Sequence, residues 1–269
     1  MTRKPTEVCV FCGVGKPTKE HIFGKWMKQH VESPFTRTEH RTAIMQGEEG
    51  GSVGWRPILN RNGAPHTIQI KIACGLPCNN GWMSDFQENA KPHLLQLMEA
   101  RWPVTSRDVI LDIARWATMV TMSLEFAHSS TIAVTSTERL YLKEHLRPPD
   151  NWQIYVGLRD NHLHTGAFWH RAMLFNNGET SEAVADRPNA QLTTFHIGRS
   201  FFHVLSGPLE FLPNPSSYAS YLGIRQIWPE PNPIPPTPLI FTHAGVIRVA
   251  TQLFVDRGMD PTPGGGLLT

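Results

Sequence analysis

Two short stretches decide how the N-terminal part of this chain folds: CVFCG at residues 9–13 and CGLPCNNGW at residues 74–82. Together they hold all four cysteines of the 269-residue chain. In a reducing compartment, two close cysteine pairs that lie far apart in the sequence favour a metal site over disulfides. The spacing therefore predicts one zinc ion bound by four thiolates, those of Cys9, Cys12, Cys74 and Cys78.

Disulfides are the alternative to zinc. Two bridges can be drawn among four cysteines, and a single bridge from Cys9 to Cys12 would match the redox pair of thioredoxin-like proteins. That redox pair requires a surrounding βαβ unit, which the sequence pattern does not indicate. If zinc is bound instead, four thiolates leave no open position on a tetrahedral ion, so the zinc would hold structure and would not catalyse.

The segment between the cysteine pairs contains one clear strand. Residues 66–72 alternate between polar and apolar side chains, which predicts a half-buried strand leading into the second pair. Residues 84–98 then have a helical pattern, and Glu20 and His21 lie in a short extended segment after the first pair. Residues 33–65, rich in Gly, Thr, Arg and Glu, are expected to form an irregular insertion. The cysteine pairs thus bracket a predicted strand–strand–helix unit.

This order of features resembles the HNH endonuclease superfamily. The chain carries C-x-x-C, then Glu-His, then a strand, then C-x-x-x-C-N-N-G-W. It is most similar to the branch of bacterial HNH proteins that has a zinc-binding cysteine quartet and a C-N-N-G-W segment, and the resemblance covers roughly residues 9–100. It implies a zinc-stabilised ββα-metal (HNH) domain that hydrolyses phosphodiester bonds of double-stranded DNA with a catalytic Mg²⁺ or Mn²⁺ ion.

The resemblance also assigns roles to three side chains. His21 takes the place of the general base that activates water, Glu20 stands where the family has a metal-binding aspartate, and Asn79 stands where the family has a metal-binding His or Asn. The chemistry suits the types of residue, because imidazole has an unperturbed pKa near 6.5 and hard divalent ions prefer oxygen ligands. The alternatives are an ordinary surface role for His21 and Glu20 and a helix N-cap for Asn79. The second cysteine pair is one residue longer than the usual C-x-x-C, which leaves Asn80 as a competing ligand.

Charge is concentrated near this segment. The net charge of the whole chain is only +2, but residues 1–30 contain six lysines and arginines against Glu7 and Glu20. A local basic cluster attracts phosphates. We therefore expect Lys19 and Lys25 to contact nucleic acid, with an ordinary solvated surface as the alternative.

The remainder of the chain predicts an α+β fold. Apolar residues recur at helical spacing over residues 106–126, with Thr105 or Ser106 as the N-cap, and residues 137–146 suggest another helix. Several strands follow residue 152. We expect a domain boundary at Trp102–Pro103, which gives an HNH-type domain at 1–102 and an α+β domain of unknown role, a helical segment followed by a β-rich region, at 103–269.

The composition is that of a globular protein, with 40% hydrophobic and 18% charged residues. No stretch reaches the roughly 18–20 apolar residues of a membrane span, and the first residues lack an apolar signal core. These features predict a cytoplasmic protein without a membrane partner. Two functions remain: a DNA endonuclease, or a noncatalytic zinc-stabilised module that binds nucleic acid or protein on a decayed HNH scaffold.

Overall fold

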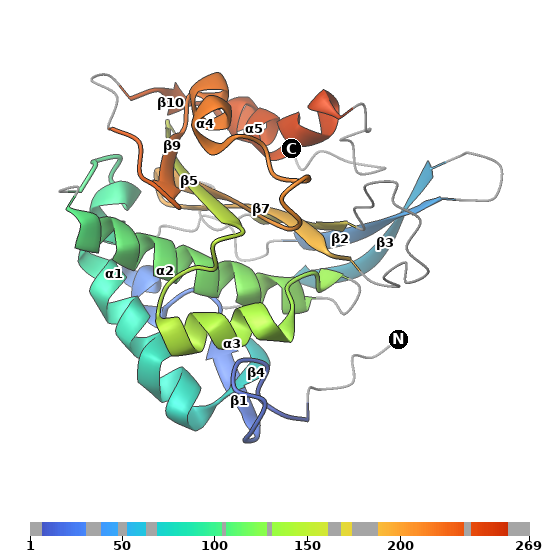
Figure 1. Cartoon of the computed structure of the whole chain (residues 1–269), viewed down its shortest axis with the longest axis vertical. Coiled ribbons are helices and arrows are strands. Elements are labelled where there is room, and N and C mark those ends of the chain that lie inside the picture. The colour runs from blue at the N-terminus through green and yellow to red at the C-terminus, as the bar shows by residue number, and fades with distance from the viewer. Residues whose placement is uncertain are drawn as a thin grey trace.

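The computed structural model describes residues 7–30, 39–47, 53–62, 69–103, 106–127, 131–160, 168–173, 188–233 and 238–257. These residues form a mixed helix and sheet structure, which confirms the predicted α+β class (Figure 1). The strands are β1 (Pro17–His21), β2 (Glu39–Gly47), β3 (Val53–Asn62), β4 (Gln69–Cys74), β5 (Trp152–Arg159), β6 (Phe168–Met173), β7 (Ala190–Ile197), β8 (Ser200–Ser206), β9 (Arg225–Trp228) and β10 (Ile240–Phe241). The helices are α1 (Met83–Met98), α2 (Arg107–Leu124), α3 (Ser136–His145), α4 (Pro215–Leu222) and α5 (His243–Asp256), with short turns of helix η1 (Lys25–Gln29), η3 (Gly75–Trp82) and η4 (Glu125–Ala127).

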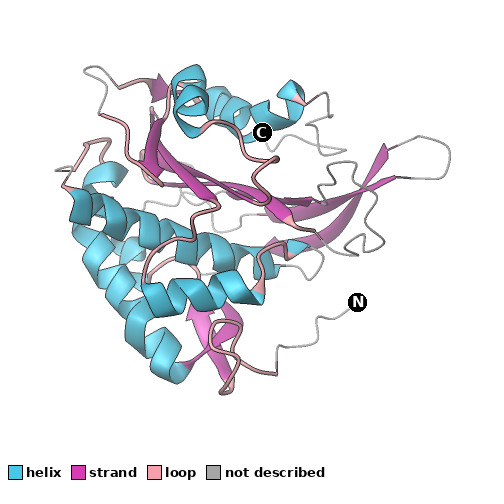
Figure 2. Ribbon diagram, viewed as in Figure 1, coloured by secondary structure: helices cyan, strands magenta, loops and turns pink. Residues whose placement is uncertain are grey.

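The largest sheet has the strand order β10-β5-β8-β7-β6, and β9 also pairs with β5. Neighbouring strands run antiparallel except for β10, which is parallel to β5. Helices α1, α2 and α3 lie on one side of this sheet, and α4 and α5 lie on the other (Figure 2). Each face of the sheet contributes apolar side chains to one of two cores. Phe195 of β7 packs toward α2 on one face. Leu192 of the same strand points to the opposite face, since side chains alternate along a strand, and belongs to the core beneath α4 and α5.

Helix α2 is the centre of the larger core. It begins as predicted, because the Ser106 hydroxyl accepts a hydrogen bond from the Val109 amide at 3.3 Å. Trp116 of α2 is fully buried and meets the rings of Phe195 and Phe202 at centroid distances of 5.8 and 5.3 Å. Its indole N–H donates to Gln87 of α1 at 3.1 Å. The helix thereby joins the cysteine-bearing part of the chain to the large sheet.

The expected boundary at residue 102 falls inside a continuous core. The larger cluster of buried apolar residues begins at Cys9 and extends to Ile227. Helices α1 and α2, which flank Trp102–Pro103, pack against each other. The division into 1–102 and 103–269 stays a prediction, and the packing across it means that the two parts share one apolar interior.

One predicted segment is wrong where the structure describes it. Residues 33–65 were expected to be irregular, but β2 and β3 pair antiparallel over residues 39–47 and 53–62 in a two-stranded ribbon that extends away from the large sheet (Figure 1). Residues 53–59 do alternate, with Val53, Trp55, Pro57 and Leu59 at every second position, but Pro57 within the run and the lack of alternation in residues 39–47 obscured the strand signal. The other expected elements of this region are present as β4 and α1, although residues 66–68 of the predicted strand lie outside the described part of the chain.

Among the described residues, no helix is both long and apolar enough to cross a membrane.

Candidate metal centre and the adjoining hairpin

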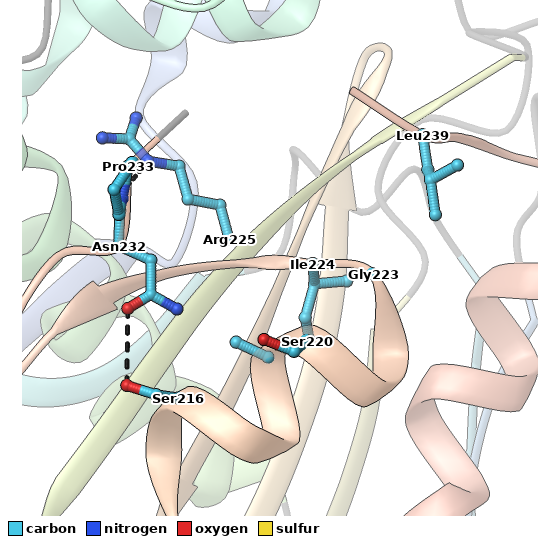
Figure 3. Close-up of a pocket in the computed structure, with 9 residues that line it drawn as sticks. Ser216, Ser220, Gly223, Ile224, Arg225, Asn232, Pro233 and Leu239 are labelled. Atoms are coloured by element: carbon cyan, nitrogen blue, oxygen red, sulfur yellow. Dashed lines mark hydrogen bonds between the residues drawn. The ribbon is translucent and has the colours of Figure 1, made fainter. Parts of the chain in front are cut away.

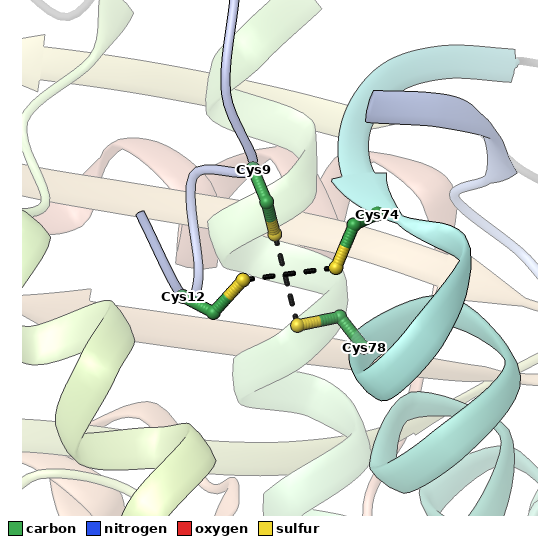
Figure 4. A group of neighbouring side chains, drawn as sticks. All are labelled: Cys9, Cys12, Cys74 and Cys78. Carbon is green, nitrogen blue, oxygen red and sulfur yellow. Dashed lines mark hydrogen bonds between the residues drawn. The ribbon is translucent and has the colours of Figure 1, made fainter. Parts of the chain in front are cut away.

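The four cysteines form one compact cluster. Their Sγ atoms all lie within 4.8 Å of one another and converge from two segments of the chain (Figure 4). The sulfurs of Cys9 and Cys78 are 3.7 Å apart, and those of Cys12 and Cys74 are 3.6 Å apart. Tetrahedral zinc with Zn–S bonds near 2.3 Å separates its sulfurs by about 3.8 Å, so the cluster could hold a metal such as zinc. All four cysteines are free thiols, which argues against the disulfide alternative.

The loop that carries the first pair depends on two glycines. The Cys9 amide donates to the Gly15 carbonyl at 3.0 Å, and the Gly13 amide donates to the Cys9 carbonyl at 2.9 Å. Gly13 and Gly15 have φ angles of +72° and +78°, a left-handed conformation that other residues rarely adopt. A Cβ on Gly15 would also lie 3.0 Å from the Cβ of Cys74. These glycines let the chain return tightly and bring the two cysteine pairs together.

The protein environment alone does not favour four thiolates. Burial raises the pKa of Cys78 and of Cys74, although the Trp82 indole N–H opposes the shift at Cys78. Burial acts in the same direction on Cys9, but backbone N–H groups, that of Cys74 first, outweigh it and leave the pKa of Cys9 lowered. Buried thiols therefore lose their protons most readily when a divalent cation binds the sulfurs and replaces those protons.

Strands β1 and β4 form a two-stranded antiparallel sheet that extends from this cluster. It is called the β1–β4 hairpin below, although β2 and β3 lie between the two strands in the chain. The two strands are antiparallel, with Pro17 opposite Cys74 at the cluster end and His21 opposite Gln69 at the other. Strand β4 then continues through η3 into α1. The cysteine cluster thus ties the start of the hairpin to the segment that enters the helix.

Glu20 and His21 lie on opposite faces of the hairpin, as expected for successive residues of a strand. Glu20 pairs with Ile70, which is only 3% exposed, so its side chain is on the inner face. Burial raises the pKa of Glu20 to about 7, against the opposing effects of the His21 amide and the Lys25 ammonium. Burial also lowers the pKa of His21, with a further contribution from Lys25. The lowered pKa favours the uncharged form of the His21 imidazole.

Asn79 does not cap a helix. It lies inside η3, and the N-cap position of α1 is Trp82, which makes no side-chain capping bond. Instead the Asn79 amide nitrogen donates to the Thr18 hydroxyl at 3.2 Å. Thr18 is three residues from His21, which corresponds to about 10 Å along a strand. The convergence of Glu20, His21 and Asn79 on one ion stays a prediction.

Two residues on the outer face of the hairpin, Gln69 and Lys71, were not among the candidate site residues predicted from the sequence. Lys71 lies directly opposite Lys19, and the Gln69 side chain reaches His21, with 2.7 Å between Gln69 Nε2 and His21 Nε2. Both follow from the register of the hairpin, which no local pattern specifies. Lys19, Lys25 and Lys71 are all exposed, so the predicted phosphate contacts Lys19 and Lys25 are accessible.

A separate hollow lies beside α4, away from the residues predicted from the sequence (Figure 3). Its volume is about 490 Å³, and Asn232 lines it together with Ser216 and Arg225, the two residues that bond to Asn232. The Asn232 carbonyl accepts from Arg225 Nε at 3.0 Å, and its side-chain oxygen accepts from Ser216 at 3.5 Å. These polar groups satisfy one another, so the hollow adds no reactive group to the candidate site.

Comparison of the chain with known protein families, with characterised proteins and with solved structures gives no significant match.

Proposed function

We propose that this protein is a metal-dependent DNA endonuclease of the HNH type, with a zinc-stabilised ββα-metal unit around the β1–β4 hairpin. The observation that carries the proposal is the arrangement of one hairpin: the four-cysteine cluster at one end and the Glu20–His21 pair at the other. The order strand, strand, helix formed by β1, β4 and α1 supports the same unit. The cysteine cluster has the structural role, since four thiolates leave zinc no open position.

Glu20 and Asn79 are the proposed ligands of a catalytic Mg²⁺ or Mn²⁺ ion. A carboxylate and an amide oxygen are ligands that such hard ions prefer. The raised pKa of Glu20, which burial causes, also means that a cation would stabilise its ionised form. The ion would supply positive charge for the phosphate and its leaving oxygen.

His21 is the proposed general base. As a neutral imidazole it can accept the proton of a water molecule that attacks phosphorus, which a protonated ring could not do. Its place on the opposite face of β1 from Glu20 lets it act on that water without binding the ion itself. Lys19 and Lys25, both exposed, would hold the nearby DNA phosphates by salt-dependent attraction.

A plasmid-nicking assay with added Mg²⁺ or Mn²⁺ tests the base. His21→Ala should lower the rate of cleavage by about 10²–10⁴-fold, the usual contribution of a positioned general base, while DNA affinity stays nearly unchanged. His30→Ala is the matched control, since His30 is an exposed histidine of the same segment and should cut at the wild-type rate. Equal cleavage by His21→Ala and wild type would refute the assignment.

The proposed ligands should respond differently to metal. Glu20→Ala or Asn79→Ala should weaken binding of the divalent ion, so that excess Mn²⁺ restores part of the cleavage. No concentration of Mn²⁺ should rescue His21→Ala, because a metal does not replace a lost base. EDTA should stop cleavage before it removes zinc from the cysteine cluster.

The noncatalytic module remains the second candidate, because the cysteine cluster and the exposed lysines would suit it equally well. Purified wild type that binds DNA and never cuts it, with any divalent ion, would establish that candidate over the nuclease. Lys19→Glu with Lys25→Glu should weaken DNA binding under either function.

A further inference from the structure

The contact between His21 and Gln69 constrains which nitrogen of the imidazole carries a proton. The two residues are directly opposite each other in the β1–β4 hairpin, and the Gln69 amide group faces His21 Nε2 at 2.7 Å. This is hydrogen-bonding distance. One nitrogen of the ring is thereby occupied by a protein partner, and only Nδ1 is left to meet a water molecule.

The two ends of the amide have opposite consequences. A half-turn of the Gln69 amide exchanges its nitrogen and oxygen without moving another atom, so either end can face Nε2. If the amide nitrogen donates, Nε2 is the acceptor and the ring proton is on Nδ1, where it blocks the remaining nitrogen. If the amide oxygen accepts, the proton is on Nε2 and Nδ1 keeps a free lone pair. Only the second arrangement leaves His21 able to act as a base.

We propose that Gln69 is a positioning residue: its side-chain oxygen accepts a hydrogen bond from His21 Nε2–H and so holds Nδ1 unprotonated toward the substrate water. The proposal rests on the proposed function of His21 as the general base. The cross-strand pairing supports it, because a directly opposed pair on one face brings the two side chains together without a change of backbone.

The proposed role of His21 requires this arrangement and not a donor role for Gln69, because a base needs an unprotonated nitrogen that faces the water. His21 and Gln69 are next to the opposed pair Lys19 and Lys71 on the same outer face. The ammonium groups of these two lysines would draw a DNA phosphate to the same face as His21.

The first experiment observes the ring directly and needs no cleavage. In a long-range ¹H–¹⁵N spectrum of ¹⁵N-labelled protein, recorded above the pKa of the imidazole, the signals of His21 are identified by their loss in His21→Gln. We expect wild type to show a protonated Nε2 and an unprotonated Nδ1. A ring protonated mainly on Nδ1, or an even mixture of the two forms, would overturn the proposal.

The second experiment separates an acceptor from a donor. Gln69→Leu should lose the preference for one form and lower kcat by about three- to tenfold, the worth of one neutral hydrogen bond, with KM for DNA unchanged. Gln69→Glu keeps an acceptor oxygen and has no N–H, so it should retain the Nε2–H form and recover most of kcat. Gln29→Leu, the same change at an exposed position of η1, should match wild type in both measurements.

The results distinguish the positioning role from the function on which it rests. If wild type never cleaves DNA, the nuclease proposal fails, while the spectrum still reports whether Gln69 selects the form of His21. If wild type cleaves but Gln69→Leu keeps both the Nε2–H form and the full kcat, Gln69 has no positioning role. A Gln69→Leu protein with the wild-type zinc content and urea midpoint excludes misfolding as the cause of a lower kcat.

Discussion

Replacing Arg139 tests how firmly the cysteine loop is held by the rest of the fold. Arg139 of α3 is 10% exposed and pairs with Glu125, which is fully buried, at 2.7 Å. The same guanidinium donates to the Val134 carbonyl at 2.8 Å and, through Nε, to the Val10 carbonyl at 3.2 Å. Val10 lies between the first two cysteines. One side chain therefore links a buried carboxylate, α3 and the metal-binding loop.

The expected loss of stability in Arg139→Met is about 3–5 kcal/mol, because removing one partner of a buried ion pair leaves the other charge without compensation. Glu125 would keep the backbone amides of Ala133 and Val134 as donors, both at 3.0 Å, but no cation. Adding Glu125→Gln to the variant should recover part of the loss, since a neutral amide is cheaper to bury than a carboxylate. Because the bond to Val10 is also lost, the affinity for zinc should fall.

Urea unfolding measures the first effect, and competition with a zinc-chelating dye measures the second. Arg101→Met is the control: its ion pair with Glu99 is exposed, with 64% and 62% of the side chains accessible, so its loss should cost at most about 1 kcal/mol. If Arg139→Met and Arg101→Met unfold at the same urea concentration, the buried pair does not stabilise the fold as inferred.

Three further predictions concern the metal, the pH dependence of stability and a close contact. Purified protein should contain about one zinc per chain by elemental analysis, and Cys78→Ser should lose both the zinc and much of the stability; wild type without zinc would refute the assignment of the cluster. Burial lowers the pKa of His203 to about 3, so the unfolded chain takes up a proton near pH 6.5 while the folded chain does not. Stability should therefore fall between pH 7 and 5, by about 2 kcal/mol from His203 alone, and His203→Gln should show a correspondingly shallower pH dependence of the urea midpoint. Gly198→Ala places a Cβ 2.7 Å from the Met98 carbonyl oxygen at a φ of +52°, so it should lower the free energy of unfolding by about 1–3 kcal/mol. Gly13→Ala should cost less, because φ is +72° there but the space around the new Cβ is open. Equal urea midpoints for the two variants would contradict a clash at Gly198.

The sequence alone determined the features that depend on local spacing. Paired cysteines predicted a metal cluster because thiolates in a tight loop are brought together by only a few backbone dihedrals, and the structure gathers the four sulfurs as expected. Helical periodicity predicted α2, and Thr105 or Ser106 as the N-cap predicted where it begins, because an apolar stripe and an N-cap are both properties of neighbouring residues. Alternation of polar and apolar side chains predicted the strand that became β4, for the same reason.

Only the tertiary structure decided which segments meet. The β2–β3 ribbon depends on the pairing of β3 with residues 39–47, which show no apolar alternation. The place of β10 beside β5 depends on a parallel pairing across more than 80 residues. The pairing of Gln69 with His21 depends on the register of the β1–β4 hairpin, in which a slip of one strand by one residue would move the side chain of that strand to the other face. Glu125 and Arg139 likewise show nothing in the sequence that marks them as buried partners, since a charge is stable in the interior only when the fold brings a compensating charge and hydrogen bonds to it. Contacts of this kind are set by the simultaneous packing of distant elements, which no local pattern of residues encodes.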